Sequence, residues 1–330
     1  MLLALAVCAV TVFPRYGTYV PTPRLHGPGL LLDGAGASSS PDNTLTWLHE
    51  RLLGDTARRG GNVVILRASY ANIDDRHFYD AGTFASVQTI LISPCASTSE
   101  VNKVATIVDG ADAVYFAGGD QANYVRWKGT ELIAAVKRVY ARGGVVGGGS
   151  AGLAIQGAVV YDSVAADAMN LETTTADAAK DPLEQRISFT TGLFAWPALQ
   201  DTITDTHLVA RDRLGRTIAF LARIFYDRLL PNADQIYALG IDEGSAVVVD
   251  PDGTATLLTE KDGRGAYLVR TDTPPRLVPG EPLHYTVEIA HIARNGERFD
   301  LLHKQTPERW YTITVDGTRP PYYNENPYEQ

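Results

Sequence analysis

The hydrophobic positions of this chain alternate between short continuous runs and longer stretches with helical spacing. Before residue 160 the continuous runs occupy 29–33, 62–66, 87–92, 111–116 and 145–146. Apolar residues recur at intervals of three or four over 45–53, 101–108 and 129–140. Continuous runs are typical of strands buried on both faces, and the wider spacing is typical of helices with one buried face. The alternation predicts an α/β fold with a doubly wound, mostly parallel sheet.

The second half of the chain continues this pattern and then changes. Strand-like runs follow at 187–189, 203–207, 235–241 and 245–250, with a helix-like segment over 214–229. Pro251-Asp252-Gly253 is a hairpin turn signal, after which short β-like runs continue to about residue 302. Residues 74–83 show no period and predict a loop, and residues 319–323 predict a loose tail. The predicted organisation is a lead-in segment over 1–28, an α/β domain over 29–250 and a β-rich extension over 251–330.

Composition narrows the classes of function. The 330 residues carry a formal net charge of −9, which argues against a nucleic-acid partner because neutralising phosphates takes clustered Lys and Arg. No Cys or His pair has the spacing of metal ligands, so no metal site is expected. The glycine-rich stretch after residue 33 lacks the Gly-x-Gly-x-x-Gly spacing, so we expect no dinucleotide cofactor there.

Residues 1–13 form a mostly apolar run that ends at Pro14 and Arg15. The run is too short to span a bilayer, and its length suits the core of an export signal, although no Lys or Arg precedes it. Two alternatives stay open: an exported protein whose leader is removed, or a cytoplasmic protein in which the run forms a first buried strand. Without the leader, Cys95 loses Cys8 as a partner, and we expect it to be a small core residue.

The stretch Gly148-Gly149-Ser150-Ala151-Gly152 follows a predicted strand and precedes an apolar, helix-like segment. A serine between glycines at such a turn has the Gly-x-Ser-x-Gly pattern of a nucleophile elbow. The turn exposes the serine Oγ at the open end of the sheet, and the glycines let neighbouring backbone approach. Ser150 is therefore the candidate nucleophile, and the alternative is a tight turn that merely uses small residues.

A serine nucleophile needs a base to take its proton, and histidine is the usual one. Of the seven histidines, His207 alone ends a strand-like run inside a polar segment, so it is the candidate; the alternative is a surface histidine beside arginines. Gly118 and Gly119 follow another predicted strand, and ligands gather at the carboxyl ends of parallel strands. The backbone N–H groups of Gly119 and Ala151 are the candidate oxyanion hole.

Four segments together resemble the signature blocks of the cyanophycinase and dipeptidase E family of serine peptidases, in that family's order. They are Ala117-Gly118-Gly119-Asp120-Gln121, 148–152, 205–216 and Gly240-Ile241-Asp242-Glu243. The resemblance covers roughly residues 30–250. It implies a class I glutamine-amidotransferase-like, flavodoxin-like fold with serine in place of the amidotransferase cysteine. It also implies an exopeptidase that hydrolyses multi-arginyl-polyaspartate (cyanophycin) or related β-aspartyl peptides without a cofactor, and it is compatible with a homodimer.

The resemblance assigns roles to the catalytic positions. It makes Ser150 the nucleophile and His207 the base, and it matches Asp167 to the acidic third member of the triad. Asp162 competes for that last role, whereas Asp205 is expected to shape the end of its strand.

The resemblance also implies substrate contacts. Gln121 would contact the substrate, and Arg211, Arg213 and Arg216 would form a basic cluster near the site. Guanidinium groups suit a free carboxylate, which they hold through two parallel hydrogen bonds. Arg216 has an alternative role in folding, since it lies inside a predicted helix. Residues 172–184 look like an insertion relative to the family.

Two other functions compete with a peptidase of this type. An α/β-hydrolase esterase shares the elbow but usually takes its acid from after a later strand. A non-catalytic binding domain could keep the amidotransferase-like fold, because fold alone does not dictate activity.

Overall fold

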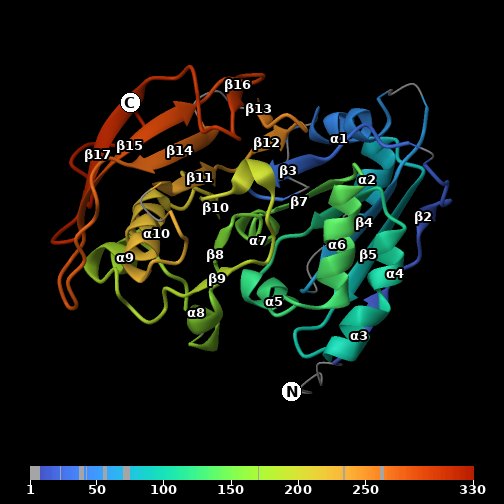
Figure 1. Ribbon diagram of the computed structural model, residues 1–330, viewed down its shortest axis with the longest axis horizontal. Coiled ribbons are helices and arrows are strands. Elements are labelled where there is room, and N and C mark those ends of the chain that lie inside the picture. The colour runs from blue at the N-terminus through green and yellow to red at the C-terminus, as the bar shows by residue number, and fades with distance from the viewer. Residues whose placement is uncertain are drawn as a thin grey trace.

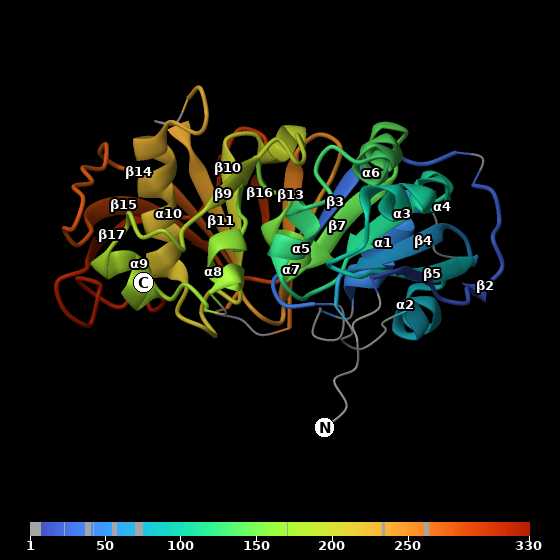
Figure 2. The same ribbon diagram turned by 90° about the horizontal axis from the view of Figure 1, so that it is seen from below.

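The computed structural model describes residues 8–22, 24–36, 41, 43–54, 58–69, 75–169, 171–232, 235–260 and 264–330 (Figure 1). The start of the apolar N-terminal run, 1–7, and the end of the glycine-rich stretch, 37–40, lie outside these ranges. The described residues build two β-sheets that lie side by side along the long axis of the molecule, with helices packed around them (Figures 1 and 2).

The centre of the first sheet is parallel and has the strand order β5-β4-β6-β7-β3. These strands are β3 (Gly29–Asp33), β4 (Asn62–Arg67), β5 (Ser86–Ile92), β6 (Ala113–Phe116) and β7 (Val145–Gly149). Each coincides with a continuous apolar run of the sequence, and almost every residue in them is buried. The α/β class predicted from the hydrophobic pattern is therefore confirmed.

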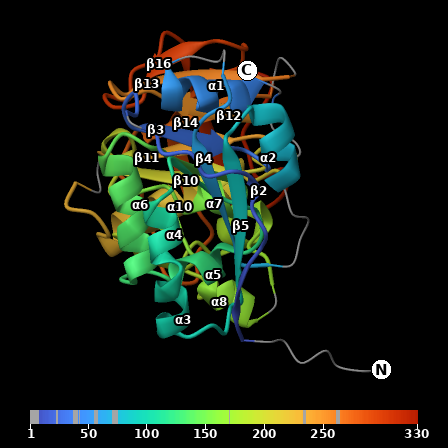
Figure 3. The same cartoon turned by 90° about the vertical axis from the view of Figure 1, so that its right-hand side faces the viewer.

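Helices cover both faces of this parallel centre because neighbouring strand residues point to opposite sides. Leu30 and Leu32 pack into one apolar cluster, and Leu31 packs into another on the opposite face. Figure 3 shows α4 and α6 on one side of β4 and β5, and α2 on the other. The covering helices are α1 (Asn43–Leu53), α2 (Asp75–Gly82), α3 (Thr98–Lys103), α4 (Ala105–Asp109), α5 (Gln121–Val125) and α6 (Glu131–Ala141).

Two predicted elements differ locally from the structure. The stretch predicted as a loop over 74–83 contains helix α2, and Asp74 lies outside the described residues. The helix was missed because few of its apolar side chains are buried: Phe78 is fully buried and its ring lies 5.0 Å from that of Tyr115. The helix predicted over 101–108 is divided at Val104 into α3 and α4.

The second sheet has the strand order β17-β15-β14-β11-β10-β8-β9. Its strands are β8 (Val159–Tyr161), β9 (Phe189–Thr191), β10 (Thr202–Thr206), β11 (Tyr237–Ile241), β14 (Ala266–Thr271), β15 (His284–Ile292) and β17 (Trp310–Asp316). The strands β8, β10 and β11 run parallel to one another, and the others pair antiparallel. The apolar face of α10 (Leu214–Asp227) packs on this sheet, beside α9 (Thr175–Lys180).

The C-terminal part of the chain is rich in β-structure, as predicted, and it contributes to both sheets. The strands β12 (Ser245–Val249), β13 (Thr254–Thr259) and β16 (Arg298–Asp300) extend the first sheet beyond β3. The turn signal at 251–253 does join an antiparallel pair, because Val249 lies opposite Ala255. The later strands β14, β15 and β17 form one side of the second sheet.

The N-terminal segment is attached to the edge of the first sheet. Strand β1 (Val10–Val12) pairs antiparallel with β5, and a disulfide joins Cys8 to Cys95. Cys95 is exposed, so the expectation of a small core residue is wrong: the thiol is used in a covalent link at the surface. Among the helices of the described ranges, none combines the length and the apolar content needed to cross a bilayer.

The end of β3 connects the two sheets at the centre of the molecule. The carbonyl oxygen of Asp33 accepts a hydrogen bond from the backbone N–H of Ser150 (3.2 Å), at the end of β7. The carbonyl oxygen of Gly34 accepts one from the backbone N–H of His207 (3.1 Å), at the end of β10. A Cβ atom on Gly34 would lie 2.0 Å from the carbonyl oxygen of Asp242, so only glycine fits between these strands.

We predict that Gly34→Ala destabilises the protein. The added methyl group meets backbone that cannot move away independently, and overpacking of this kind typically lowers the free energy of unfolding by about 1–3 kcal/mol. Gly110→Ala is the matched control, because the nearest atom to its new Cβ lies at 3.5 Å, an ordinary contact distance. Denaturant unfolding of both variants measures the difference, and equal midpoints would contradict this account of Gly34.

Candidate active site

Ser150 lies at the turn between β7 and α7 (Ala151–Ala154), where its backbone has φ 52° and ψ −116°. A non-glycine residue with positive φ is strained, and such strain is concentrated at functional sites. The flanking glycines are needed for packing. A Cβ atom on Gly148 or on Gly152 would lie 2.3 Å or 2.0 Å from the carbonyl oxygen of Phe116. The turn thus has the geometry of the predicted elbow.

His207 is placed against Ser150 by strand β10. Its Nε2 atom lies 2.8 Å from the Oγ of Ser150, and its side chain is 8% exposed. The residue has φ 51°, so the chain leaves the strand in a left-handed turn, and the ring meets Ser150 directly after β7. The structure therefore brings together the two residues that the sequence singled out.

The third residue in this chain of contacts is Glu243. Its Oε1 lies 2.6 Å from the Nδ1 of His207. Strands β10 and β11 are parallel neighbours, with Thr206 opposite Ile241, so residues just beyond their carboxyl ends lie close together. A carboxylate only accepts hydrogen bonds, so Nδ1 carries the proton and Nε2 accepts from the Ser150 hydroxyl.

Glu243 was missed as a partner of His207, although a signal for it existed. It is the last residue of the segment Gly240–Glu243, one of the four that resemble the family's signature blocks, and the pattern by itself assigns no role to the acidic residues of that segment. Its neighbour Asp242 is fully buried, and one of its carboxylate oxygens accepts the backbone N–H groups of Val209 (3.0 Å) and Ala210 (2.9 Å). Asp242 thereby holds the loop that follows His207.

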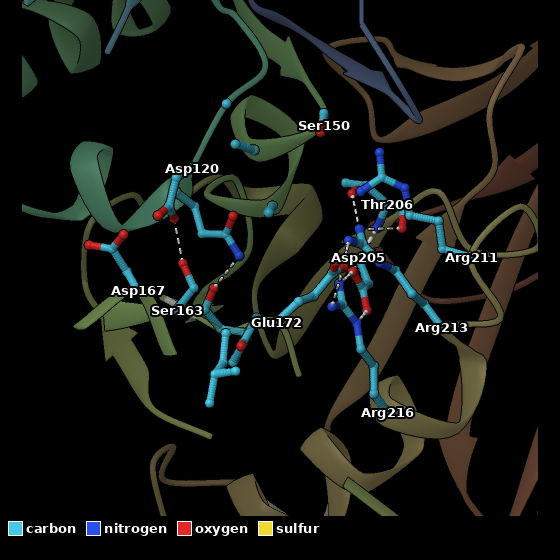
Figure 4. A pocket seen from close by; sticks show the side chains of 16 residues that line it. Asp120, Ser150, Ser163, Asp167, Glu172, Asp205, Thr206, Arg211, Arg213 and Arg216 are labelled. Carbon is cyan, nitrogen blue, oxygen red and sulfur yellow. Dashed lines mark hydrogen bonds and ion pairs between the residues drawn. The ribbon is translucent and has the colours of Figure 1, made fainter. Parts of the chain in front are cut away.

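The contact predicted between Asp167 and His207 is absent among the described residues. Asp167 lies on α8 (Val164–Ala168), and its carboxylate is 3.5 Å from the Nη2 of Arg126. Figure 4 shows it on the opposite side of the pocket from Arg211, which is why it cannot reach the His207 loop. Burial, reinforced by the nearby carboxylate of Asp120, raises the pKa of Asp167.

Asp162, the competing acid, makes local contacts instead. Its carboxylate accepts hydrogen bonds from the hydroxyl groups of Ser188 (2.5 Å) and Thr190 (2.8 Å) and from the backbone N–H of Val164 (3.0 Å). These contacts tie the start of α8 to strand β9. The carboxylate that contacts His207 is that of Glu243.

A pocket of about 310 Å³ opens beside the Ser150 hydroxyl. The pocket is lined by Gly119 and Ala151, the candidate oxyanion donors, and by Gln121, the residue expected to contact the substrate. All three therefore share one cavity with the serine. Gly119 has φ 144°, a conformation that favours glycine. The side-chain amide of Gln121 donates to the carbonyl oxygen of Tyr161 at 3.3 Å.

The guanidinium of Arg216 is buried and forms hydrogen bonds within the protein. It donates to both carboxylate oxygens of Asp205 (2.9 and 2.6 Å) and to the carbonyl oxygen of Thr173 (3.1 Å). Burial by itself would raise the pKa of Asp205, but the guanidinium of Arg216 outweighs it and holds that pKa below its usual value. These contacts indicate that Arg216 serves the fold, which was the alternative to a role in substrate binding.

Arg211 and Arg213 belong to the loop that begins at His207. Arg211 is half-exposed at the pocket, and its Nε lies 4.0 Å from the Oε1 of Glu243. Arg213 is nearly buried, with its Nη1 donating to the carbonyl and hydroxyl oxygens of Thr206 and its Nη2 in close contact with Glu172. These two guanidinium groups form the basic side of the pocket (Figure 4).

The same loop is held from outside by the C-terminal segment. The phenol groups of Tyr323 and Tyr328 both donate to one carboxylate oxygen of Asp212, each at 2.8 Å. The phenol oxygen of Tyr323 also accepts the backbone N–H of Gly215. The prediction of a loose tail after 319 is therefore wrong, because aromatic rings of that tail pack on the second sheet's core and bond to this loop.

No protein-family profile and no curated protein matches the chain. Solved structures do resemble it. A peptidase from an acI-B1 Actinobacterium has 13% identity and a TM-score of 0.44, over 79% of this chain and 98% of that chain. A "Putative Peptidase E Protein from Listeria monocytogenes EGD-e" has 12% identity and a TM-score of 0.42, over 71% of this chain and 99% of that chain. The likeness is distant, so the contacts of the site itself decide which chemistry it supports.

The electrostatics of His207 lead to a prediction. Burial lowers the pKa of His207 below 6.5, and the carboxylate of Glu243 partly opposes that shift. Because Glu243 stabilises the imidazolium form, Glu243→Gln should lower the pKa of His207 further. NMR titration of the His207 ring, assigned with a His207→Gln variant, measures the change.

Asp167→Asn is the control for this titration, since Asp167 contacts Arg126 across the pocket. It should leave the pKa of His207 nearly unchanged. A larger shift in Asp167→Asn than in Glu243→Gln would restore Asp167 as the carboxylate coupled to His207.

Proposed function

We propose that this protein is a serine peptidase of the cyanophycinase type, an exopeptidase that hydrolyses β-aspartyl peptides. The observation that carries the proposal is the continuous chain of hydrogen bonds from Ser150 through His207 to Glu243, at 2.8 and 2.6 Å. A nucleophile, a base and an orienting carboxylate in this order are the parts that acyl transfer requires.

The geometry supports a two-step reaction. The Oγ of Ser150 attacks the peptide carbonyl while the Nε2 of His207 takes the hydroxyl proton. His207 then gives that proton to the leaving amine, and an acyl-enzyme ester remains on Ser150. Water, deprotonated by the same Nε2, attacks the ester carbonyl, the bond to the Oγ of Ser150 breaks, and His207 returns the proton to that oxygen. Glu243 keeps the ring in the required tautomer and stabilises the imidazolium that forms.

Backbone N–H groups would stabilise the negative charge on the carbonyl oxygen. Ala151 starts α7 directly after the nucleophile, and Gly119 lines the same pocket. We propose these two N–H groups as the oxyanion hole, which in serine hydrolases typically contributes about 10²–10³ in kcat per donor. Gly118 supports this placement, because its Cβ position lies 3.5 Å from the Cβ of Ser150.

The charge distribution of the pocket supports a substrate that carries a negative group at one end and a positive group at the other. Arg211 and Arg213 lie on one side, and the carboxylates of Asp120 and Asp167 lie on the other (Figure 4). A β-aspartyl-arginine unit offers a free carboxylate to the arginines and a guanidinium to the carboxylates. Gln121, which follows Asp120 directly and lines the same pocket, would bond the peptide backbone.

Replacing the proposed residues should affect catalysis unequally. We expect Ser150→Ala to fold normally and to lose hydrolysis altogether. Glu243→Gln should lower kcat by about 10³–10⁴-fold, because the imidazole loses its tautomer and orientation. Asp167→Asn should lower kcat far less than Glu243→Gln does. The assay is mass detection of products from insoluble cyanophycin and from a panel of α- and β-aspartyl dipeptides.

Each competing function has its own outcome in this assay. Hydrolysis of simple acyl esters with no action on β-aspartyl peptides would favour an esterase. Full activity in purified Ser150→Ala protein would contradict the serine mechanism. No turnover of any substrate by the intact protein would favour a binding domain.

We also propose that the protein is exported. The disulfide between Cys8 and Cys95 supports this, because disulfides persist mainly in oxidising compartments. Cys8 lies inside the apolar run over 1–13, so the exported protein has to keep that part of the run for the disulfide to form. The expected result is an N-terminal sequence that retains Cys8 and no free thiol in the protein isolated from its natural host. A mature chain that begins after Cys8 would contradict this proposal.

A further inference from the structure

Glu172 lies at the edge of the pocket on firmly held backbone. The next residue, Thr173, is fully buried; its hydroxyl accepts from the phenol of Tyr161 (2.8 Å), and its carbonyl oxygen accepts from Arg216 (3.1 Å). The side chain of Glu172, by contrast, is 56% exposed and lines the pocket. A fixed backbone therefore carries a carboxylate that water and ligands can reach.

The carboxylate of Glu172 binds the guanidinium that faces the pocket. Its Oε1 contacts the Nη2 of Arg213 directly and lies 3.8 Å from the Nη1 of Arg216. Burial alone would raise the pKa of Glu172, but its contact with Arg213 outweighs burial and lowers that pKa. The group is therefore ionised at neutral pH and neutralises Arg213.

Arg213 has contacts besides Glu172 that hold its position. Its Nη1 is already held by the carbonyl and hydroxyl oxygens of Thr206, at 3.1 and 3.2 Å. The side chain is 10% exposed, so the surrounding protein restricts it further. Glu172 thus adds charge neutralisation at Nη2, and both residues line the pocket.

Without Glu172, the basic side of the pocket would carry an uncompensated charge. The buried carboxylate of Asp205 already neutralises Arg216. Arg211 has Glu243 as its nearest acidic neighbour, at 4.0 Å. Arg213 also lines the pocket, and its Nη2 already contacts Glu172, so a ligand carboxylate that is to bind Nη2 has to take the place of Glu172.

We propose that Glu172 is an internal substitute for the substrate carboxylate: it occupies the Nη2 edge of Arg213 and must be displaced when a carboxylate ligand binds. This inference rests on the proposed function for its substrate, and it makes Glu172 a residue that sets specificity. Exchange of one carboxylate for another at Arg213 yields little net free energy. A ligand therefore binds well only if it also makes the remaining contacts of the pocket.

Removal of the charge on Glu172 should strengthen the binding of simple carboxylates. In full-length protein carrying Ser150→Ala, isothermal titration with succinate should give a Kd about tenfold lower after Glu172→Gln, the size expected when one charge-assisted hydrogen bond becomes available. Succinamide, which has no carboxylate, should bind equally to both proteins. Glu172→Asp keeps the charge but shortens the reach, and it should give an intermediate gain.

The matched control is Glu184→Gln. Glu184 belongs to the same stretch of the chain and makes an ion pair with Arg186, so its replacement changes the net charge equally outside the pocket. It should leave succinate binding unchanged. Adding Arg213→Met to Glu172→Gln should remove the gain, because Arg213 is the group that Glu172 covers.

The sign of the effect separates this inference from a positioning role. If Glu172 serves to orient Arg213, Glu172→Gln should weaken succinate binding or leave it unchanged, and either result overturns the proposal. A gain that survives Arg213→Met also overturns it. Thermal unfolding of each variant shows whether it is folded before titration.

The titration is independent of turnover, so the two proposals fail separately. If the intact protein hydrolyses no β-aspartyl peptide but Glu172→Gln tightens succinate binding, the peptidase proposal fails and the role of Glu172 stands. If hydrolysis occurs, Glu172→Gln should lower KM for β-aspartyl dipeptides and leave kcat nearly constant. Hydrolysis without tighter binding leaves the peptidase proposal standing and removes this one.

Discussion

The site depends on the end of strand β3, where one short piece of backbone bonds to both halves of the molecule. Asp33 accepts from the N–H of Ser150 in the first sheet, and Gly34 accepts from the N–H of His207 in the second. Because these are main-chain bonds at the first residues after two strands, the separation of the two side chains is set by backbone geometry. The absence of a side chain on Gly34 lets Asp242 approach, and Glu243 follows it directly.

The loop that starts at His207 is strained and is held at several points. His207 and Asp212 both have positive φ, a conformation that costs free energy for residues other than glycine. Asp242 binds the backbone of the loop from the strand side, and the phenol groups of Tyr323 and Tyr328 bind Asp212 from the C-terminal segment. The last residues of the chain thus support the base and the two pocket arginines.

The local hydrophobic pattern was sufficient to predict the parallel strands of the first sheet. The strands β3 to β7 were found because parallel strands between two layers of helices need continuous apolar runs, as in the fully buried Leu30, Leu31 and Leu32. The division into two sheets was not predicted, because a buried run such as 203–207 reads the same in either sheet. Helix α2 was missed because its contact with the core depends mainly on Phe78, and one buried ring leaves no period.

The sequence by itself indicated the elbow at Ser150, through the Gly-x-Ser-x-Gly turn after an apolar run, and singled out His207, which ends a strand-like run inside a polar segment. Only the tertiary structure decided which carboxylate meets the histidine. The parallel pairing of β10 with β11 brings Glu243 to the Nδ1 of His207, whereas α8 carries Asp167 to Arg126 on the far side of the pocket. The contact of Glu172 with Arg213 has the same origin. These partners lie 36 and 41 residues apart in sequence. Tertiary structure brings them together, so a local sequence pattern does not reveal the contact.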